Sequence, residues 1–364
     1  MTPLRIIEPN LRHPSHHYAE FVRALGARRP ADGGPVEVLA HPGADRLLAS
    51  MPGVVAVTDP PRMDAPWAEW RAIARALRRP DPFLVLTADG RHAMAVHLLS
   101  AGAPSPPVHA RLYFHWIERS PLRLAMLRAA TRARLHALAV TPTEAIADAV
   151  RGLGWRRVAH VPYPALAPAV PPAPAPFARV LMAGAARMNK GLDLVAALAQ
   201  RWAAAGRRTP LVVQASMKHA ARHGRREAAV VGALLASGCP GLVADARPLD
   251  RAEYADRYRG SLVIAPYERE RFAEAVSGVV LDALLHGAPV VATAGTWPGR
   301  QVERFGAGVV LKERTVEALE AAIDAVLRDW DACSARAREA ARTLAAEHDA
   351  ANLFRVLAGE EDAR

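Results

Sequence analysis

The sequence predicts a doubly wound α/β protein with two domains, on three observations. Short apolar runs alternate with helix-like segments along most of the 364 residues, which is the pattern of a parallel sheet covered by helices on both faces. Seven prolines in fifteen residues, at 162–176, divide the chain near its middle. The length is sufficient for two domains that each bury a core of their own.

Thirteen runs rich in aliphatic residues are the predicted strands. They are Leu4–Glu8, Val36–His41, Val54–Asp59, Phe83–Ala88, Ala110–His115, Leu138–Thr141 and Arg157–Tyr163 in the first half, and Arg179–Gly184, Leu211–Ala215, Leu242–Asp245, Ser261–Pro266, Val290–Ala294 and Gly308–Leu311 in the second. Because proline continues neither a helix nor a central strand, we expect an extended linker at 166–177 between domains at 1–165 and 178–340. The tract from Val316 to Leu357 is alanine-rich and predicted to be helical.

Composition indicates a folded protein of ordinary polarity. Hydrophobic residues make up 51% and charged residues 23% of the chain, and no apolar run approaches the length that crosses a bilayer. The first eight residues lack a basic region followed by an apolar core, so a cytoplasmic location is the default expectation. Cys239 and Cys333 have no His or Cys companions at ligand spacing, which indicates neither a disulfide framework nor a zinc site.

The charge balance favours anionic partners. Lysine and arginine number 47 against 36 acidic residues, a formal charge of +11, which suits nucleoside diphosphates, phospholipid surfaces or nucleic acid. Residues 119–136 carry five arginines and an apolar stripe. They form either a helix that rests on an anionic membrane or an ordinary amphipathic surface helix. No nucleic-acid recognition motif is present, so nucleic acid is not an expected partner.

Two carboxylates, Glu274 and Asp282, flank a predicted helix start. Ser277 is a good N-cap, residues 278–286 are compatible with a helix, and Gly287 is a plausible stop. Gly278 and Asp282 fall on one face, so the missing side chain leaves room for a ligand beside the carboxylate. Carboxylates accept hydrogen bonds from vicinal hydroxyls, and a first helical turn favours oxygen ligands. The pattern indicates a sugar-nucleotide site, with a capped surface helix and incidental acids as the alternative.

A second segment suits a diphosphate. Gly184 ends a predicted strand, a loop runs through Arg187 to Lys190, and Gly191 opens an apolar helix. The helix N–H groups and Lys190 can share the negative charge that grows on a departing diphosphate. The alternative is a solvated loop lysine. No Gly-Lys-Ser/Thr follows, so this is not a Walker A loop.

Both segments resemble those of the retaining glycosyltransferases of family 4. Residues 274–282 are similar to the family's E-x7-E signature, with Asp282 in place of the second Glu. Residues 184–191 are similar to its G-R-L-x-x-E-K-G motif, with Ala185 in place of Arg and Asn189 in place of Glu. The resemblance implies the GT-B fold, in which two Rossmann-like doubly wound domains face a central cleft. It also implies a final helix, here within 341–364, that packs back on the first domain.

The same resemblance implies roles for the second-domain residues. It assigns the donor sugar to Glu274 and the ribose of the nucleotide to Asp282. Lys190 would hold the diphosphate, and Arg187 is our candidate for the cation that Ala185 does not supply. Loss of the usual Arg leaves open an altered donor or a degenerate site.

Two histidines of the first domain are candidates through the resemblance. His115 ends a predicted strand, where family members carry a histidine beside the donor sugar; a hydrogen-bonded structural histidine is the alternative. Ser15-His16 takes the place of the Gly-His that relatives carry in a glycine-rich turn near the donor phosphates and the acceptor. His16 or the adjacent His17 is the candidate contact, and a helix entry is an equally compatible interpretation of the pair.

The sequence therefore predicts a metal-independent hexosyltransferase without a cofactor. It would move a sugar from a nucleoside diphosphate to a hydroxyl of a glycan, a lipid-linked sugar or a small molecule, with retained anomeric configuration, in the cytoplasm or peripherally at the inner membrane face, as in bacterial glycan synthesis. The alternatives are a non-catalytic nucleotide-sugar-binding protein and a basic nucleic-acid-binding protein. The expected site residues are His115, Glu274 and Lys190 in catalysis; Gly184, Arg187, Lys190, Gly191, Glu274, Ser277, Gly278 and Asp282 in donor binding; and His16 on the acceptor or phosphate side.

Overall fold

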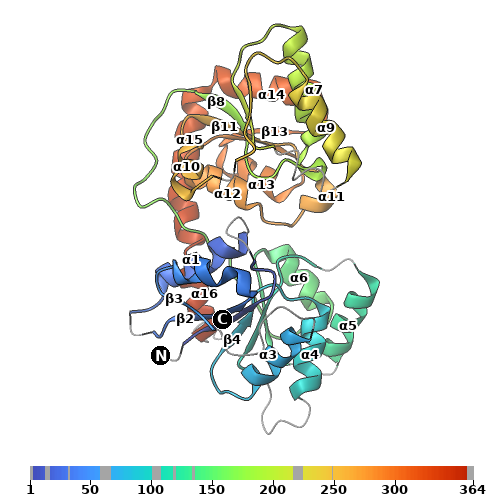
Figure 1. The fold of residues 1–364 in the computed structure, drawn as a ribbon, viewed down its shortest axis with the longest axis vertical. Coiled ribbons are helices and arrows are strands. Elements are labelled where there is room, and N and C mark those ends of the chain that lie inside the picture. The colour runs from blue at the N-terminus through green and yellow to red at the C-terminus, as the bar shows by residue number, and fades with distance from the viewer. Residues whose placement is uncertain are drawn as a thin grey trace. The chain divides into compact units, whose positions relative to one another are not determined.

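The computed structural model divides the chain into two compact units. The first consists of Met1–Leu166 and Glu347–Arg364, and the second of Ala167–Ala346. The structure describes residues 3–12, 17–31, 33–57, 67–100, 108–117, 120–132, 136–215, 224–247 and 249–358. In Figure 1 the blue-to-teal segments and the red C-terminal helix belong to the first unit, and the yellow and orange segments belong to the second.

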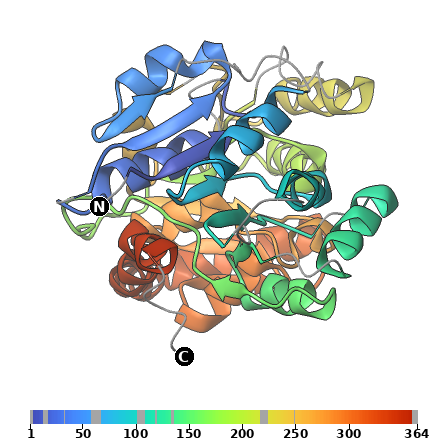
Figure 2. The same ribbon diagram turned by 90° about the horizontal axis from the view of Figure 1, so that it is seen from below.

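The first unit contains a parallel sheet in the order β3-β2-β1-β4-β5-β6-β7. Its strands appear in blue to green in the view of Figure 2. They are β1 (Arg5–Glu8), β2 (Val36–Ala40), β3 (Val54–Ala56), β4 (Phe83–Val85), β5 (Ala110–Tyr113), β6 (Leu138–Thr141) and β7 (Val158–His160). The described helices are α1 (His17–Arg28), η1 (Pro42–Ala44), α2 (Asp45–Ala49), α3 (Ala68–Leu77), α4 (Gly90–Ser100), α5 (Pro121–Arg132), α6 (Glu144–Gly152) and α16 (Ala350–Ala358).

The C-terminal residues are built into the first unit. Helix α16 packs against α1, and the backbone N–H of Ala165 donates to the carbonyl of His348 at 2.9 Å. The ring of His348 in turn lies 2.6 Å from the carbonyl of Tyr163 through its Nδ1. The sequence placed this returning segment at 341–364, and the structure begins it at Glu347.

The second unit contains a parallel sheet in the order β10-β9-β8-β11-β12-β13. Its strands are β8 (Arg179–Met182), β9 (Leu211–Val213), β10 (Leu242–Ala244), β11 (Ser261–Ala265), β12 (Val290–Thr293) and β13 (Gly308–Leu311). The described helices are η2 (Met188–Lys190), α7 (Leu192–Ala204), α9 (Arg225–Leu235), α10 (Arg251–Asp256), α11 (Arg269–Phe272), α12 (Gly278–Leu285), α13 (Trp297–Phe305), α14 (Val316–Arg328) and α15 (Trp330–Glu347).

The proline-rich segment is fixed to the second unit at its far end. The indole N–H of Trp330 donates to the carbonyl of Ala175 at 3.0 Å, and the ring of Phe177 meets the same indole edge-on at 5.3 Å. The linker that the sequence placed at 166–177 therefore groups with the second unit from Ala167 onward. None of the described helices is long and apolar enough to span a bilayer.

The predicted fold class is confirmed, because both units are parallel sheets with helices between their strands. Each of the thirteen expected strands is present in the described residues, and several end earlier than predicted. Strand β8, for example, stops at Met182, not at Gly184. In both sheets the strand order reverses beside the first strand, at β1/β4 and at β8/β11. Such switch points are where doubly wound sheets bind ligands.

Candidate functional site

The predicted donor residues gather at the switch point of the second sheet. The loop after β8 carries Gly184, Arg187 and Lys190, and the loop after β11 leads to Glu274 and α12. Strands β8 and β11 are hydrogen-bonded neighbours. Since they are parallel, both loops leave the sheet at the carboxyl ends of the strands.

A glycine contact brings the two loops together. Gly191 has a left-handed backbone, with φ of 87°, and a Cβ at this position would lie 2.5 Å from Pro266 Cγ and 2.6 Å from the Pro266 carbonyl oxygen. The backbone N–H of Glu268 also donates to the carbonyl of Asn189 at 3.0 Å. Only glycine satisfies both the backbone angle and the close approach, so Gly191 fixes the distance between the loops.

The ammonium group of Lys190 lies beside the first turn of α12. A Cβ on Gly184, whose φ is 73°, would be 3.8 Å from Lys190 Nζ and 2.9 Å from Cγ2 of Val279. Lys190 Nζ is also 5.8 Å from the centre of the Tyr267 ring. Lys190 Nζ and the Val279 side chain, in the first turn of α12, therefore both lie next to Gly184. A cation near a helix N-terminus favours an anion.

Burial and a second cation set the ionisation of Lys190. Burial, together with the nearby charge of Arg187, lowers the pKa of Lys190 to about 8. A lowered pKa means that the charged form of Lys190 costs free energy in the unliganded protein. An anion placed between Lys190 and Arg187 would reduce that cost.

Polar side chains from neighbouring elements hold the β8 loop in place. The backbone N–H of Gly184 donates at 2.9 Å to Oε1 of Gln214, the residue that follows β9. The backbone N–H of Met188 donates to Oε1 of Glu227 on α9 at 3.1 Å. The loop that carries Lys190 is therefore anchored at both ends of its turn.

Helix α12 begins as the sequence predicts. The Ser277 side chain accepts from the backbone N–H of Val280, so the predicted N-cap is confirmed. Burial raises the pKa of Tyr267 to about 12, while a hydrogen bond with Ser277 opposes the shift. A Cβ on Gly278 would meet nothing within 4 Å. The space expected beside the start of α12 is therefore present.

Asp282 lies one turn into α12 and contacts a pair of buried phenols. The hydroxyl of Tyr254 donates to Oδ2 of Asp282 at 3.1 Å, and that of Tyr258 donates to Tyr254 at 2.6 Å. Burial holds the pKa of both phenols well above the usual range. Both remain protonated donors at neutral pH, so Tyr254 orients the Asp282 carboxylate.

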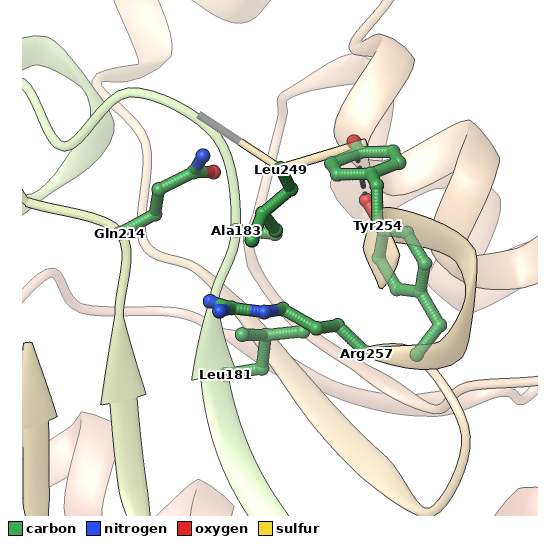
Figure 3. Close-up of a pocket in the computed structure, with 7 residues that line it drawn as sticks. Leu181, Ala183, Gln214, Leu249, Tyr254 and Arg257 are labelled. Carbon is green, nitrogen blue, oxygen red and sulfur yellow. Dashed lines mark hydrogen bonds between the residues drawn. The ribbon is translucent and has the colours of Figure 1, made fainter. Parts of the chain in front are cut away.

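A narrow gap, too small to hold a water molecule, lies among residues that include the partners of Gly184 and Asp282. Figure 3 shows Gln214 on one side of Ala183 and Tyr254 on the other, with the guanidinium of Arg257 extending toward the strands. Gln214 holds the Gly184 backbone and Tyr254 holds Asp282. The lining residues are Leu181, Ala183, Gln214, Leu249, Tyr254, Arg257 and Tyr258.

Glu274 is paired with a cation of α13. Nη2 of Arg300 donates to Oε2 of Glu274 at 2.8 Å and to the carbonyl of Ala273 at 2.6 Å. Both charged side chains are 41% exposed. An ion pair this exposed contributes little stability, so the hydroxyls of a ligand can compete for the carboxylate at small cost.

The first-unit histidines fall in different situations. His115 follows β5, is 7% exposed, and lies among aromatic rings, with centroid distances of 4.7 Å to Tyr113 and 5.9 Å to both Tyr18 and Tyr163. It therefore forms part of an aromatic cluster at the carboxyl end of the first sheet. His16 lies outside the described residues.

The first switch point contains a buried acid that the sequence reasoning missed. Glu8 ends β1 and is fully buried; it accepts from the backbone N–H of Asn10 at 2.7 Å and from the hydroxyl of Thr87. Burial raises the pKa of Glu8 to about 7, although these hydrogen bonds and the charge of His92 oppose the shift.

Other residues of the two sites were also missed. Glu8 ends β1, Gln214 directly follows β9, and Tyr267 comes two residues after β11. The rule that parallel strands bind ligands at their carboxyl ends would therefore have found them. Tyr254 and Arg300 lie on helices, and nothing in their local sequence distinguishes them from ordinary helix residues.

Comparisons with known proteins identify the fold. No family model matches the chain, and no curated protein sequence matches it. The crystal structure of HepE from Anabaena in complex with UDP aligns over 100% of both chains, with a TM-score of 0.72 and 14% identity. A glycosyltransferase from Rickettsia africae covers 100% of this chain and 99% of its own, with a TM-score of 0.71 and 12% identity. Sucrose-phosphate synthase from Thermosynechococcus elongatus covers 99% of this chain and 100% of its own, with a TM-score of 0.69 and 14% identity. The chain thus has the two α/β units of the GT-B glycosyltransferase fold.

The contact at Gly191 can be tested by substitution. Gly191→Ala should lower the free energy of unfolding by about 2–4 kcal/mol, because it adds both a strained backbone and a clash with Pro266. Gly278→Ala, which enters open space, should change it by less than about 1 kcal/mol. Urea unfolding of both variants checks this. Equal losses would contradict the account of the loop contact.

The ionisation of Glu8 should appear in stability against pH. The folded state keeps the proton up to about pH 7, whereas the unfolded chain loses it near 4.5, so stability falls as pH rises through this range. Glu8→Gln carries no charge and should be more stable than wild type by about 2 kcal/mol above pH 7. Unfolding measured from acid to mildly alkaline pH decides the matter. Parallel curves for the two proteins would show that Glu8 ionises normally.

Proposed function

We propose that the protein transfers a sugar from a nucleoside diphosphate donor to a hydroxyl acceptor. The observation that carries the proposal is the meeting of Lys190, with Arg187 nearby, and the first turn of α12 at the second switch point. The similarity to HepE, whose structures contain UDP and UDP-glucose, supports a uridine diphosphate sugar as the donor.

The contacts in the second unit suggest how a donor would be held. The diphosphate lies between Lys190 and α12, where Gly278 leaves the backbone accessible. Asp282, oriented by Tyr254, receives the ribose hydroxyls. Glu274 leaves Arg300 to accept hydroxyls of the sugar. Gly191 and Ser277 support the site through the loop contact and the helix cap.

The chemistry follows from these groups. The bond between the anomeric carbon and the diphosphate oxygen breaks, the acceptor oxygen bonds to that carbon, and the acceptor proton is released. Lys190 and Arg187 stabilise the charge that accumulates on the departing diphosphate. These side chains supply the positive charge for the leaving group, so we propose metal-independent transfer without a cofactor.

Finer features of the proposal come from the resemblance to family 4. They are family membership, retained configuration, a hexosyl donor, and His115 beside the reacting centre. His16 stays a candidate on the acceptor or phosphate side. The acceptor is a glycan, a lipid-linked sugar or a small molecule, and peripheral contact with an anionic membrane in the cytoplasm is part of the same proposal.

A protein that binds nucleotide sugars without turnover is the second candidate. It is favoured by Ala185 in the position of the usual Arg and by the Glu274–Arg300 ion pair. Donor binding with neither hydrolysis nor transfer, across a panel of sugar nucleotides and acceptors, would identify this function.

Turnover should depend on Lys190 and Glu274. Lys190→Ala and Glu274→Ala should each lower donor hydrolysis or transfer at least about a hundredfold, because each removes a charge that acts on the reacting donor. Released nucleoside diphosphate measures this. Lys312→Ala and Glu339→Ala, at exposed positions, are the matched controls. Wild-type turnover in both site variants would refute the assignment.

Diphosphate affinity should fall at alkaline pH. In the protein without UDP, Lys190 loses its proton near pH 8, because its pKa is lowered to about that value. The affinity for UDP should therefore decrease as pH rises above 8. Lys190→Arg keeps its charge throughout this range and should bind UDP with little change over the same range. Calorimetric titration at several pH values measures both. An equal decrease in the two proteins would mean that Lys190 does not contact the diphosphate.

A further inference from the structure

Arg314, which follows β13, contacts both loops of the candidate site. Its Nε donates to the carbonyl of Pro266 at 2.9 Å. Its Nη2 donates to Oδ1 of Asp193 at 2.8 Å, and its Nη1 lies 3.4 Å from Oδ2 of the same carboxylate. A longer contact of 3.5 Å joins Nη2 to the carbonyl of Met188. One guanidinium therefore bridges the β11 loop, the first turn of α7 and the turn that carries Lys190.

These contacts converge on the place where the two loops meet. The Pro266 carbonyl that accepts from Arg314 is the one that leaves no room for a Cβ on Gly191. Strand β13 lies at the edge of the sheet, and β12 separates it from β11. The segment after β13 thus sends a side chain past β12 to the switch point.

Arginine is the side chain that suits this position. Its planar guanidinium presents five donors in fixed directions, so it can engage a carboxylate and a carbonyl together. Asp193 fixes the plane of the group by accepting from two of its nitrogens. Lysine would keep the charge but cannot make these bonds in one geometry.

We infer that Arg314 is a positioning residue that keeps the β8 and β11 loops in register, so that Lys190 stays beside the first turn of α12. The inference rests on the proposed function, because the register of the loops matters only if Lys190 and α12 bind a diphosphate. Arg314 acts through Lys190 and contacts no ligand. A displacement of a binding group by a fraction of a bond length is sufficient to weaken a preorganised site.

A double-mutant cycle tests whether Arg314 acts through Lys190. Arg314→Lys should raise the dissociation constant of UDP about tenfold, measured by calorimetry. In a Lys190→Ala background the same substitution should change it by less than about twofold, because the group being positioned is already absent. Arg207→Lys is the matched control, since Arg207 is also half-buried and paired with an aspartate, Asp324, but lies before β9, at the amino ends of the strands.

Several outcomes would overturn the inference. They are an unchanged dissociation constant in Arg314→Lys, an equal loss in the presence and absence of Lys190, or an equal loss in Arg207→Lys. Failure of the wild type to bind UDP or any other nucleoside diphosphate would instead refute the proposed function.

Hydrogen exchange tests the positioning role without any ligand. Arg314→Lys should speed amide exchange in peptides that cover 188–192 and 266–268, including the Glu268 amide bonded to Asn189, relative to wild type and Arg207→Lys. Unchanged protection in those peptides would show that Arg314 does not hold the loops together.

Discussion

The candidate site depends on the close approach of two loops at the switch point of the second sheet. Gly191 packs directly against Pro266, which a side chain at 191 would prevent. Parallel pairing of β8 and β11 delivers both loops to the same edge. The glycine contact then sets their separation, so a cation from one loop lies beside the helix that begins after the other. The ring of Pro266 fixes its own φ, and glycine at 191 tolerates both the left-handed backbone and the close approach.

The two units place ionisable groups of opposite charge at equivalent points. The first strand of the first unit ends in Glu8, a buried carboxyl, and the loop after the first strand of the second unit carries Lys190. Burial raises the pKa of Glu8 and lowers the pKa of Lys190, so it favours the neutral form of each group. The surroundings differ, because Glu8 has hydrogen-bond donors from its own unit, whereas the charged neighbour that acts on Lys190 is another cation. Glu8 is therefore stabilised internally, and Lys190 is arranged for an external anion.

The sequence predicted the fold class, the strands and the start of α12, because apolar periodicity and capping are local signals. Ser277 could be identified as a cap from its neighbours alone. The sequence could not predict the partners that come from distant elements. Examples are Tyr254 for Asp282, Arg300 for Glu274 and Gln214 for Gly184. Those contacts arise when separate strands and helices meet at one edge, and no pattern within a short window records which of them do. Several strands were also predicted to extend too far at their carboxyl ends, because apolar residues continue into the loops.

The central claim is that a diphosphate binds between Lys190 and the first turn of α12. A crystal structure of the protein with UDP tests it most directly. The account predicts phosphate oxygens within hydrogen-bond distance of Lys190 Nζ and of the backbone N–H groups that open α12, about 3 Å away. UDP bound at another surface, with Lys190 and α12 free of phosphate, would contradict it.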